Sequence, residues 1–513
     1  MLDSTPVLIG AGQFTYKDDP LASPSPLELL KISALAAASD AGLTPQALAG
    51  LDTLMVVGFA VDAPGAGGSR SALPRPRNPP KSLARALGAQ PRTQAYSHMG
   101  GNTPQSLVNE VCARIARGEA AFALIAGCEF LGSLTKRMKA AVGFDGWDDG
   151  ETSEPERIGD PRPGVSAYEA AHGLAFPVNT YPLFENALRA RDRRSLEAHA
   201  RRMGELFAPF TRVAAANPYA WFPVARTAEE LITVTEHNRM VGYPYPKYLN
   251  AIMEVDQSAA VILTSLGKAR ELGVGRDRCV FLHGCADAAD LWNPLDRQDF
   301  HSSPAMRLTS RKALEMAGKS IDEIELIDLY SCFPVAVEIA CEEQGIALDD
   351  PRGLTVTGGL PYFGGPGNNY AMHAIATLVQ RLRARPGAFG MATGNGWYLT
   401  KQSVGVYSTA PIQGEWTRED PAVLQREIDA LPHPEVIETP EGEAVIEAYT
   451  VTHDRGGYRS GIVVGRDAAG RRFVAVTPDD PAVLRDLESR EGVGRAGTVG
   501  RHPDGKRNLF RPA

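Results

Sequence analysis

The chain lacks the long apolar runs, signal sequence and paired cysteines that mark several large protein classes. No apolar stretch approaches the roughly 18–20 residues of a membrane span. The first residues, MLDSTPVLIGAG, have no basic region of a signal peptide. The six cysteines show no CxxC pairing and no disulfide spacing, which is typical of reduced thiols in the cytosol. We therefore expect a cytoplasmic protein that does not cross a membrane.

Basic runs and nucleotide-binding motifs are missing as well. The net charge is −8 over 513 residues, and arginine is scattered rather than clustered, which argues against a nucleic-acid surface. Neither GxxxxGK[ST] nor a GxGxxG after a strand occurs. The acidic segment 144–164 has the residue types to hold a metal, but we interpret it as a solvated loop. We expect no metal and no bound cofactor.

What the chain does contain is an internal repeat. Residues 41–52 (AGLTPQALAGLD) match 317–328 (AGKSIDEIELID), and 102–128 match 369–395 without a gap. Each longer stretch has the pattern of a helix leading into a strand. Two collinear matches predict two copies of one α/β unit, and the seam between such units is a common place for a ligand site.

The pattern of apolar residues predicts alternating strands and helices in the first copy. We expect strands at 6–12, 51–57, 93–97, 121–126 and 259–264, and helices at 26–41, 80–87 and 103–117. Such alternation indicates parallel pairing with helices on the sheet. After residue 409 the chain is β-rich, with strands expected at 443–452, 459–467 and 471–477 and a helix at 481–489. A small OB-like barrel for packing or partner docking is the preferred interpretation, because stacking aromatics are few.

These changes of texture predict four regions. The N-terminal half covers 1–143 and 235–270, and an inserted loop domain covers 144–234. The C-terminal half covers 271–412, and the additional β-rich domain covers 413–513.

Four polar loops are expected where strands of the two copies end, at the sheet edge that carries sites in open α/β folds. They are SHMGGN (97–102), YSCF (330–333), GGLPYFGGPGNN (358–369) and ATGNGW (392–397). YSCF resembles the His-Asp-Cys-Phe loop of the thiolase superfamily, and GGLPYFGGP resembles its Gly-His-Pro loop. Residues 243–265 resemble the thiolase stretch that ends with Asp-Gly-Ala-Ala-Ala. The resemblance covers about residues 5–410, and the β-rich tail makes the chain most similar to type 1 thiolase-like proteins with an added C-terminal domain.

The resemblance implies a fold and an activity. The fold would be a duplicated thiolase fold, with two βαβαβαββ halves in α-β-α-β-α layers, an inserted loop domain and a small OB-like domain. The activity would be that of an acyl-CoA acyltransferase of the acetyl-CoA acetyltransferase type in lipid metabolism, with CoA or acyl-CoA as substrate. Thiolase cores pair as dimers, so a homodimer or a partner protein on the C-terminal domain is expected.

The reactive side chains of the family are not at their positions. The nucleophilic cysteine falls at Gly101, the Gly-His-Pro histidine at Gly365, and the acid/base cysteine near Gly394 and Asn395. Because the thiolase cycle needs a thiolate and a base, conventional thiolysis is not expected. Two functions stay open: an acyltransferase with altered catalytic residues, and a non-catalytic acyl-CoA-binding protein that acts with a partner.

Three residues are candidates for replacement chemistry. Cys332 is either a nucleophile or proton shuttle, or a half-buried cysteine in its turn. His373 is either a replacement base or a core histidine. His98 is a candidate for facing the pocket near the lost nucleophile.

Further loop residues are candidates for binding a thioester. Helix N-termini and their N–H groups hold a thioester oxygen or an oxyanion, whereas helix capping is the competing explanation for Asn102 and Asn369. The candidate binding residues are Gly100, Gly101, Asn102, Tyr330, Gly365, Asn368, Asn369, Gly394 and Asn395.

Overall fold

The first sheet of the protein is mixed and six-stranded. The computed structural model describes residues 2–63 and 73–513. The strand order is β1-β8-β4-β2-β3-β5. The strands are β1 (Pro6–Thr15), β2 (Thr53–Val56), β3 (Thr93–Ser97), β4 (Phe122–Phe130), β5 (Arg157–Ile158) and β8 (Asp256–Ser265). Parallel pairing of β2 with β3 and β4 confirms the alternating pattern, while β8 runs antiparallel to β1 and β4.

The second sheet repeats the first with fewer strands. Its order is β10-β11-β12-β9, formed by β9 (Phe281–Ala289), β10 (Leu326–Asp328), β11 (Phe389–Gly396) and β12 (Lys401–Ser408). No described strand in this sheet matches β3. In the segment that would form such a strand, the N–H groups of Val356 and Thr357 donate to the Asp328 carboxylate at 2.8 and 3.2 Å instead of to a neighbouring strand.

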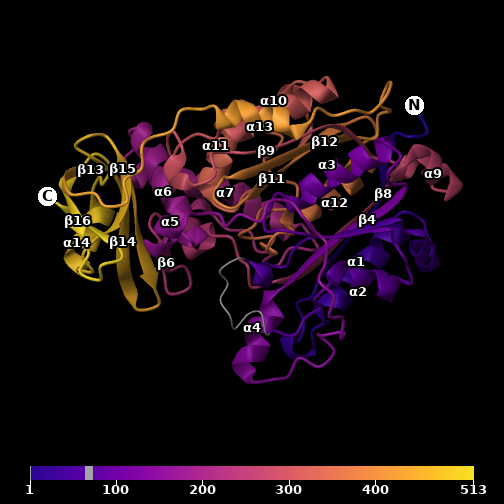
Figure 1. The fold of residues 1–513 in the computed structure, drawn as a ribbon, viewed down its shortest axis with the longest axis horizontal. Helices are drawn as coiled ribbons and strands as arrows, with labels where there is room; N and C mark the ends of the chain where they lie inside the picture. The colour runs from indigo at the N-terminus through magenta and orange to yellow at the C-terminus, as the bar shows by residue number, and fades with distance from the viewer. Residues whose placement is uncertain (1, 64–72) are drawn as a thin grey trace.

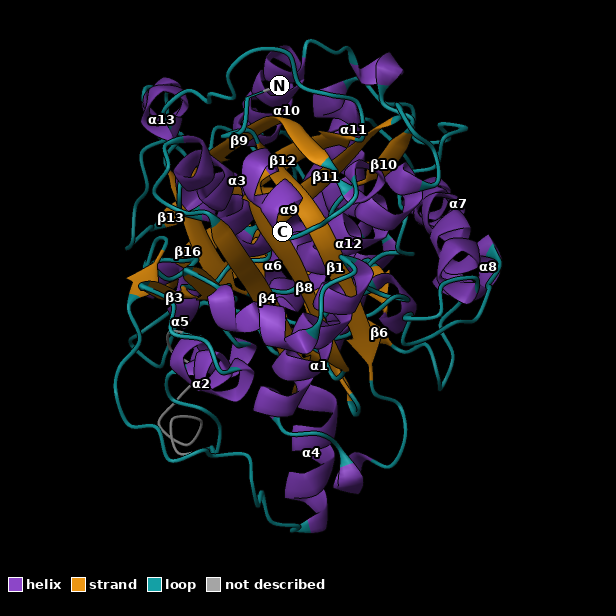
Figure 2. Ribbon diagram, turned by 90° about the vertical axis from the view of Figure 1, so that its right-hand side faces the viewer, coloured by secondary structure: helices purple, strands orange, loops and turns teal. Residues whose placement is uncertain are grey.

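Helices cover and separate the two sheets in five layers. Outside the first sheet lie α1 (Pro26–Asp40) and α2 (Pro79–Leu87), and outside the second lies α10 (Pro304–Ala317). Between the sheets lie α3 (Thr103–Ala116) and α12 (Tyr370–Arg383), which pack on each other (Figure 2). Both are buried on nearly all sides, as expected for helices inside a core. The layered thiolase-like arrangement is therefore present.

The sequence repeat corresponds to a structural repeat. Helices α3 and α12 each begin directly after an asparagine and lead into β4 and β11. The Ala-Gly pair of the shorter match ends a helix in both copies. Gly42 after α1 and Gly318 after α10 have φ of 75° and 63°, the left-handed conformation in which glycine ends helices. The matched residues thus begin and end corresponding helices in the two copies.

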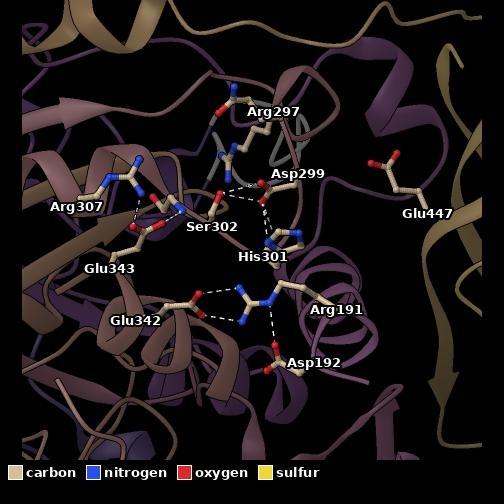
Figure 3. A network of polar contacts seen from close by, with 12 residues as sticks. Arg191, Asp192, Arg297, Asp299, His301, Ser302, Arg307, Glu342, Glu343 and Glu447 are labelled. Atoms are coloured by element: carbon tan, nitrogen blue, oxygen red, sulfur yellow. Dashed lines mark hydrogen bonds and ion pairs between the residues drawn. The ribbon is translucent and has the colours of Figure 1, made fainter. Parts of the chain in front are cut away.

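A helical region between β5 and β8 packs on the second half. It contains α5 (Ala167–Ala171), α6 (Pro177–Arg191), α7 (Leu196–Ala215), α8 (Ala228–Ile232) and the short strands β6 (Met240–Gly242) and β7 (Tyr245–Pro246). Helices α6 and α7 contact α11 (Pro334–Gln344). At the end of α6, the two terminal guanidinium nitrogens of Arg191 each donate to a carboxylate oxygen of Glu342 in α11 at 2.8 Å (Figure 3).

The C-terminal region forms a closed ring of strands. Strand β13 pairs with both β14 and β16, β14 with β15, and β17 with β15 and β16. The elements are β13 (Gly442–Asp454), β14 (Gly457–Asp467), β15 (Arg472–Val476), α14 (Pro481–Ser489), β16 (Ala496–Arg501) and β17 (Asn508–Pro512). This barrel-like domain lies at the end of the molecule opposite the N-terminus (Figure 1) and confirms the β-rich domain expected from the sequence.

One buried arginine attaches the barrel to the rest of the chain. Arg472 of β15 is fully buried and donates to the carbonyls of Leu295 and Arg297 in the second half. Its charge is balanced by Glu447 of β13 at 2.5 Å; Glu447 and Arg297 are labelled in Figure 3. The remaining helices are α4 (Leu131–Ala140), α9 (Leu266–Glu271) and α13 (Pro421–Asp429). Within the described ranges, none of the helices is both long and apolar enough to cross a membrane.

Candidate functional site

The four polar loops meet at the seam between the two halves. The first lies between β3 and α3, the second between β10 and α11, the third before α12, and the fourth at the end of β11. The N–H of Gly100 donates to Asn368 Oδ1 at 2.9 Å, which joins the first and third loops. The amide of Asn395 lies 3.9 Å from Cys332 Sγ, which joins the fourth and second. The convergence expected from the sequence is observed.

Two of the glycines at the positions of the family's reactive residues leave no room for a side chain. A Cβ atom on Gly101 would lie 2.5 Å from the Asn395 carbonyl oxygen and closer than 3.0 Å to the Tyr330 hydroxyl. A Cβ atom on Gly394 would lie 2.8 Å from Asn102 Cα. At Gly365 the contact is looser, because a Cβ atom would lie 3.2 Å from the Ile252 carbonyl oxygen. Neighbouring backbone and Tyr330 therefore occupy the space that the family's two cysteines would need.

Cys332 is in the loop cluster but is poorly suited to act as a nucleophile. Its side chain is buried, and burial raises the pKa of the thiol to about 12. Because the thiolate is the reactive form, almost none is present at neutral pH. Burial also raises the pKa of Tyr330, so this hydroxyl stays protonated beside Gly101.

His373 lies behind the third loop rather than among the converging groups. It is completely buried on α12, its ring packs on Phe363, and its Nδ1 contacts Gln13 Oε1 of β1 at 2.9 Å. Burial lowers its pKa to about 3. The ring is thus neutral and serves as a contact between α12 and the first sheet.

The asparagines of the loops cross the seam instead of capping helices. Asn102 and Asn369 precede α3 and α12 but make no side-chain capping bond, so the capping explanation is wrong. Asn102 Nδ2 donates to Ser403 Oγ at 3.1 Å, and Asn369 Nδ2 donates to the Gly127 carbonyl at 2.8 Å. Asn368 Nδ2 likewise donates across the seam. The Oδ1 atoms of Asn102 and Asn369 are buried and have no hydrogen-bond partner among the described residues.

A lysine that the sequence analysis missed lies beside the first loop. Lys401, the first residue of β12, is 9% exposed, and its ammonium group donates to the Met99 carbonyl. None of the ion pairs found in the described ranges includes it. Burial lowers its pKa to about 8. The half-buried His98 lies close by, and its pKa is lowered by burial, by Arg157 and by Lys401. The available signal was a single cation opening the otherwise uncharged strand KQSVGVYS.

Residues 160–163, called the strap below, pack on Trp292, and Trp292 lies beside Lys401. The indole N–H of Trp292 donates to the Pro163 carbonyl at 2.7 Å, and the Arg162 guanidinium stacks on the Trp292 ring at 3.7 Å. Arg162 also pairs with Asp160 at 2.7 Å. The Lys401 ammonium lies 5.7 Å from the centre of the same indole ring. Lys401 therefore lies between the first loop and Trp292, on which the strap packs.

The turn between the fourth loop and β12 is strained. Trp397 and Leu399 have φ of 57° and 59°, which costs a side-chain-bearing residue on the order of 1–3 kcal/mol. The Tyr181 hydroxyl holds the turn by donating to the Trp397 carbonyl at 2.8 Å. Backbone strain of this kind is concentrated at functional sites.

One buried group in the described part of the chain has metal-ligand residue types. Glu185 of α6, His199 of α7 and Glu338 of α11 have ligand atoms within 4.8 Å of one another. However, Glu185 already binds His199 at 2.5 Å, and Arg202 contacts Glu338 at 2.8 Å. The Tyr245 hydroxyl also donates to Glu185, so both carboxylates already have protein partners and the arrangement fits a polar contact between helices.

Comparison with solved structures gives a match over the whole chain. The crystal structure of a monomeric SCP2-thiolase-like protein type 1 from Mycobacterium smegmatis is 36% identical, covers 100% of both chains and has a TM-score of 0.85. A family model described as the additional C-terminal domain of thiolase-like protein type 1 matches residues 423–506.

More distant proteins share the central fold. The Ltp2-ChsH2(DUF35) aldolase is 18% identical, with a TM-score of 0.56 over 80% of this chain and 98% of its own. An acetyl-CoA acetyltransferase of Methanothermobacter thermautotrophicus is 27% identical over 186 residues, which are 33% of this chain and 46% of that protein. The matched region is therefore less than half the length of this curated relative.

Proposed function

Because this chain belongs to the SCP2-thiolase-like protein type 1 family, we propose that it binds a CoA thioester at the four converging loops without catalysing thiolysis. The observation that carries this proposal is the packing at Gly101 and Gly394. The loops meet at the seam, but neighbouring atoms fill the space at both of these glycines.

The electrostatics of the loops support binding of a thioester. Helices α3, α11 and α12 begin at the first, second and third loops, and the positive end of a helix dipole favours a carbonyl oxygen or an anion. The exposed side chain of Arg157 lies beside the first loop, where β5 pairs with β3 and the guanidinium acts on His98, and it suits a phosphate of a CoA ligand. These features act on the ligand without a covalent step.

The reactive groups argue against thiolysis. A thiolase cycle requires a thiolate that accepts the acyl group and a base that generates it. Burial raises the pKa of Cys332 to about 12 and lowers the pKa of His373 to about 3. Cys332 is a thiol at neutral pH, and His373 is enclosed within the core behind the loops.

We also propose that the barrel is a partner-docking module of a monomer. The similar mycobacterial protein is described as monomeric, and the neighbouring aldolase is an assembly with a DUF35 protein. Light scattering on the purified protein should give the mass of one chain. A stable dimer would contradict this second proposal but not thioester binding.

Calorimetry with CoA, acetyl-CoA and acetoacetyl-CoA, together with a thiolysis assay on acetoacetyl-CoA, tests the proposed function. We expect binding without turnover. His98→Glu should weaken binding about fivefold, because a new carboxylate near an anionic ligand costs on the order of 1 kcal/mol. The matched variant His433→Glu changes an exposed residue of the C-terminal region and should have no effect. Absence of binding at millimolar ligand would disprove the proposal.

A further inference from the structure

We propose that Lys401 is a nucleophilic amine that takes an acyl group from a thioester bound at the loops. The inference rests on the proposed function for its acyl donor and on the geometry of the Lys401 side chain for its acceptor. It assigns a covalent modification site to a residue that is neither a cysteine nor part of the four polar loops.

The surroundings of Lys401 favour an uncharged amine. The side chain is 9% exposed and lies beside the Trp292 ring, on which the strap packs. Its hydrogen bond goes to the neutral carbonyl of Met99 rather than to a carboxylate. The nearby Asp160 is engaged by two nitrogens of Arg162. A buried ammonium without an ion-pair partner is costly, and burial accordingly lowers the pKa of Lys401 to about 8.

The backbone around the lysine is shaped to admit its side chain. A Cβ atom on Gly100 would lie 2.5 Å from Asn102 Oδ1 and 3.2 Å from the Lys401 ammonium nitrogen, and one on Gly396 would lie 2.6 Å from Asn102 Oδ1 and 3.3 Å from Lys401 Cβ. The absence of side chains at these two glycines therefore leaves room for both the Asn102 amide and the Lys401 side chain. Its amine ends beside Met99, two residues before Gly101, the position of the family's nucleophile.

The proposed step is a balanced acyl transfer. The lone pair of the neutral amine attacks the thioester carbonyl carbon, and a C–N bond forms. The C–S bond then breaks, and CoA leaves as a thiolate that takes the proton lost by the nitrogen. The products are an Nε-acyl-lysine and free CoA, with no change of oxidation state. The amide keeps one N–H for the Met99 carbonyl and removes a buried charge, so the product suits this environment better than the ammonium.

The test compares Lys401 with the exposed Lys81 in the full-length protein. Purified protein is incubated with acetyl-CoA near pH 8, and acetylation at each lysine is followed by peptide mass spectrometry. About half of a lysine with a pKa near 8 is neutral at that pH, against roughly 0.4% of an ordinary lysine. We expect Lys401 to react at least about tenfold faster than Lys81, with a half-maximal rate near pH 8. Lys401→Arg should abolish the fast phase, and Lys81→Arg should leave it unchanged.

A small aryl acetate in place of acetyl-CoA separates the two parts of the inference. Preferential acetylation of Lys401 by both donors would support the proposal. Preference with the aryl ester alone would overturn the thioester donor and count against the proposed function. If Lys401 reacted no faster than Lys81 with either donor, the nucleophilic amine would be overturned, whatever calorimetry showed for CoA binding.

Discussion

Restoring the family's cysteine at Gly101 should damage the protein rather than revive thiolase activity. The new Cβ would lie 2.5 Å from the Asn395 carbonyl oxygen, which belongs to the backbone of β11 and is fixed by pairing with β12. It would also collide with the Tyr330 hydroxyl. Overpacking of a well-filled core typically costs about 1–3 kcal/mol, and a rigid backbone partner favours the upper part of that range. We therefore expect Gly101→Cys to lower the free energy of unfolding by about 3 kcal/mol.

Urea denaturation of Gly101→Cys, followed by circular dichroism, measures this loss. The matched control is Gly500→Cys, because Gly500 has no atom within 4 Å of an added Cβ; its unfolding midpoint should stay near the parental value. The thiolysis assay should find no turnover in either variant. Parental stability of Gly101→Cys, or thiolysis by it, would refute the reasoning that the loops have closed over the nucleophile position.

Three further predictions follow from the buried groups. All six cysteines, Cys332 included, are buried, so a disulfide reagent should react rapidly with none of them in the native protein and with all of them after denaturation; fast reaction of one native thiol would contradict this. Burial lowers the pKa of His373 to about 3, so below about pH 6.5 only the unfolded chain takes up this proton, and stability falls by up to roughly 1.4 kcal/mol per pH unit. His373→Gln should reduce that slope in denaturant titrations between about pH 7 and pH 5, and an unchanged slope would exclude the assignment. The carboxylates of Glu185 and Glu338 already have protein partners, so EDTA should leave the thermal midpoint unchanged; a drop of several degrees would reveal a bound ion.

Local signals in the sequence were sufficient for most of the secondary structure. Pro26 near the start of α1 and the glycine after its end delimit that helix within a residue or two. The apolar run 121–126 predicted a strand, and β4 is a strand buried along its whole length. The second sheet was less predictable, because the buried Asp328 carboxylate binds the N–H groups of Val356 and Thr357 in place of a neighbouring strand.

The candidate site was likewise predictable in part. The convergence of the loops was predictable, because strand ends of two repeated units meet at one seam. The behaviour of the individual side chains was not. His373 was a candidate base by its spacing, yet α12 turns it toward Gln13. Lys401 was overlooked because its importance comes from burial beside Trp292, more than a hundred residues earlier in the chain.

The sequence by itself determined the repeat, the alternation of strands and helices, the β-rich C-terminal region and the loss of the family's reactive residues. These follow from residue identity and from periodicities of a few residues. Only the tertiary structure decided that Tyr330 and neighbouring backbone fill the space at Gly101 and that the loop asparagines join the halves. The tertiary structure alone also placed the Lys401 amine, which has no ion-pair partner among the described residues, beside the first loop. The physical reason is that burial, desolvation and steric closeness depend on atoms brought together from distant parts of the chain, and these set both reactivity and available space.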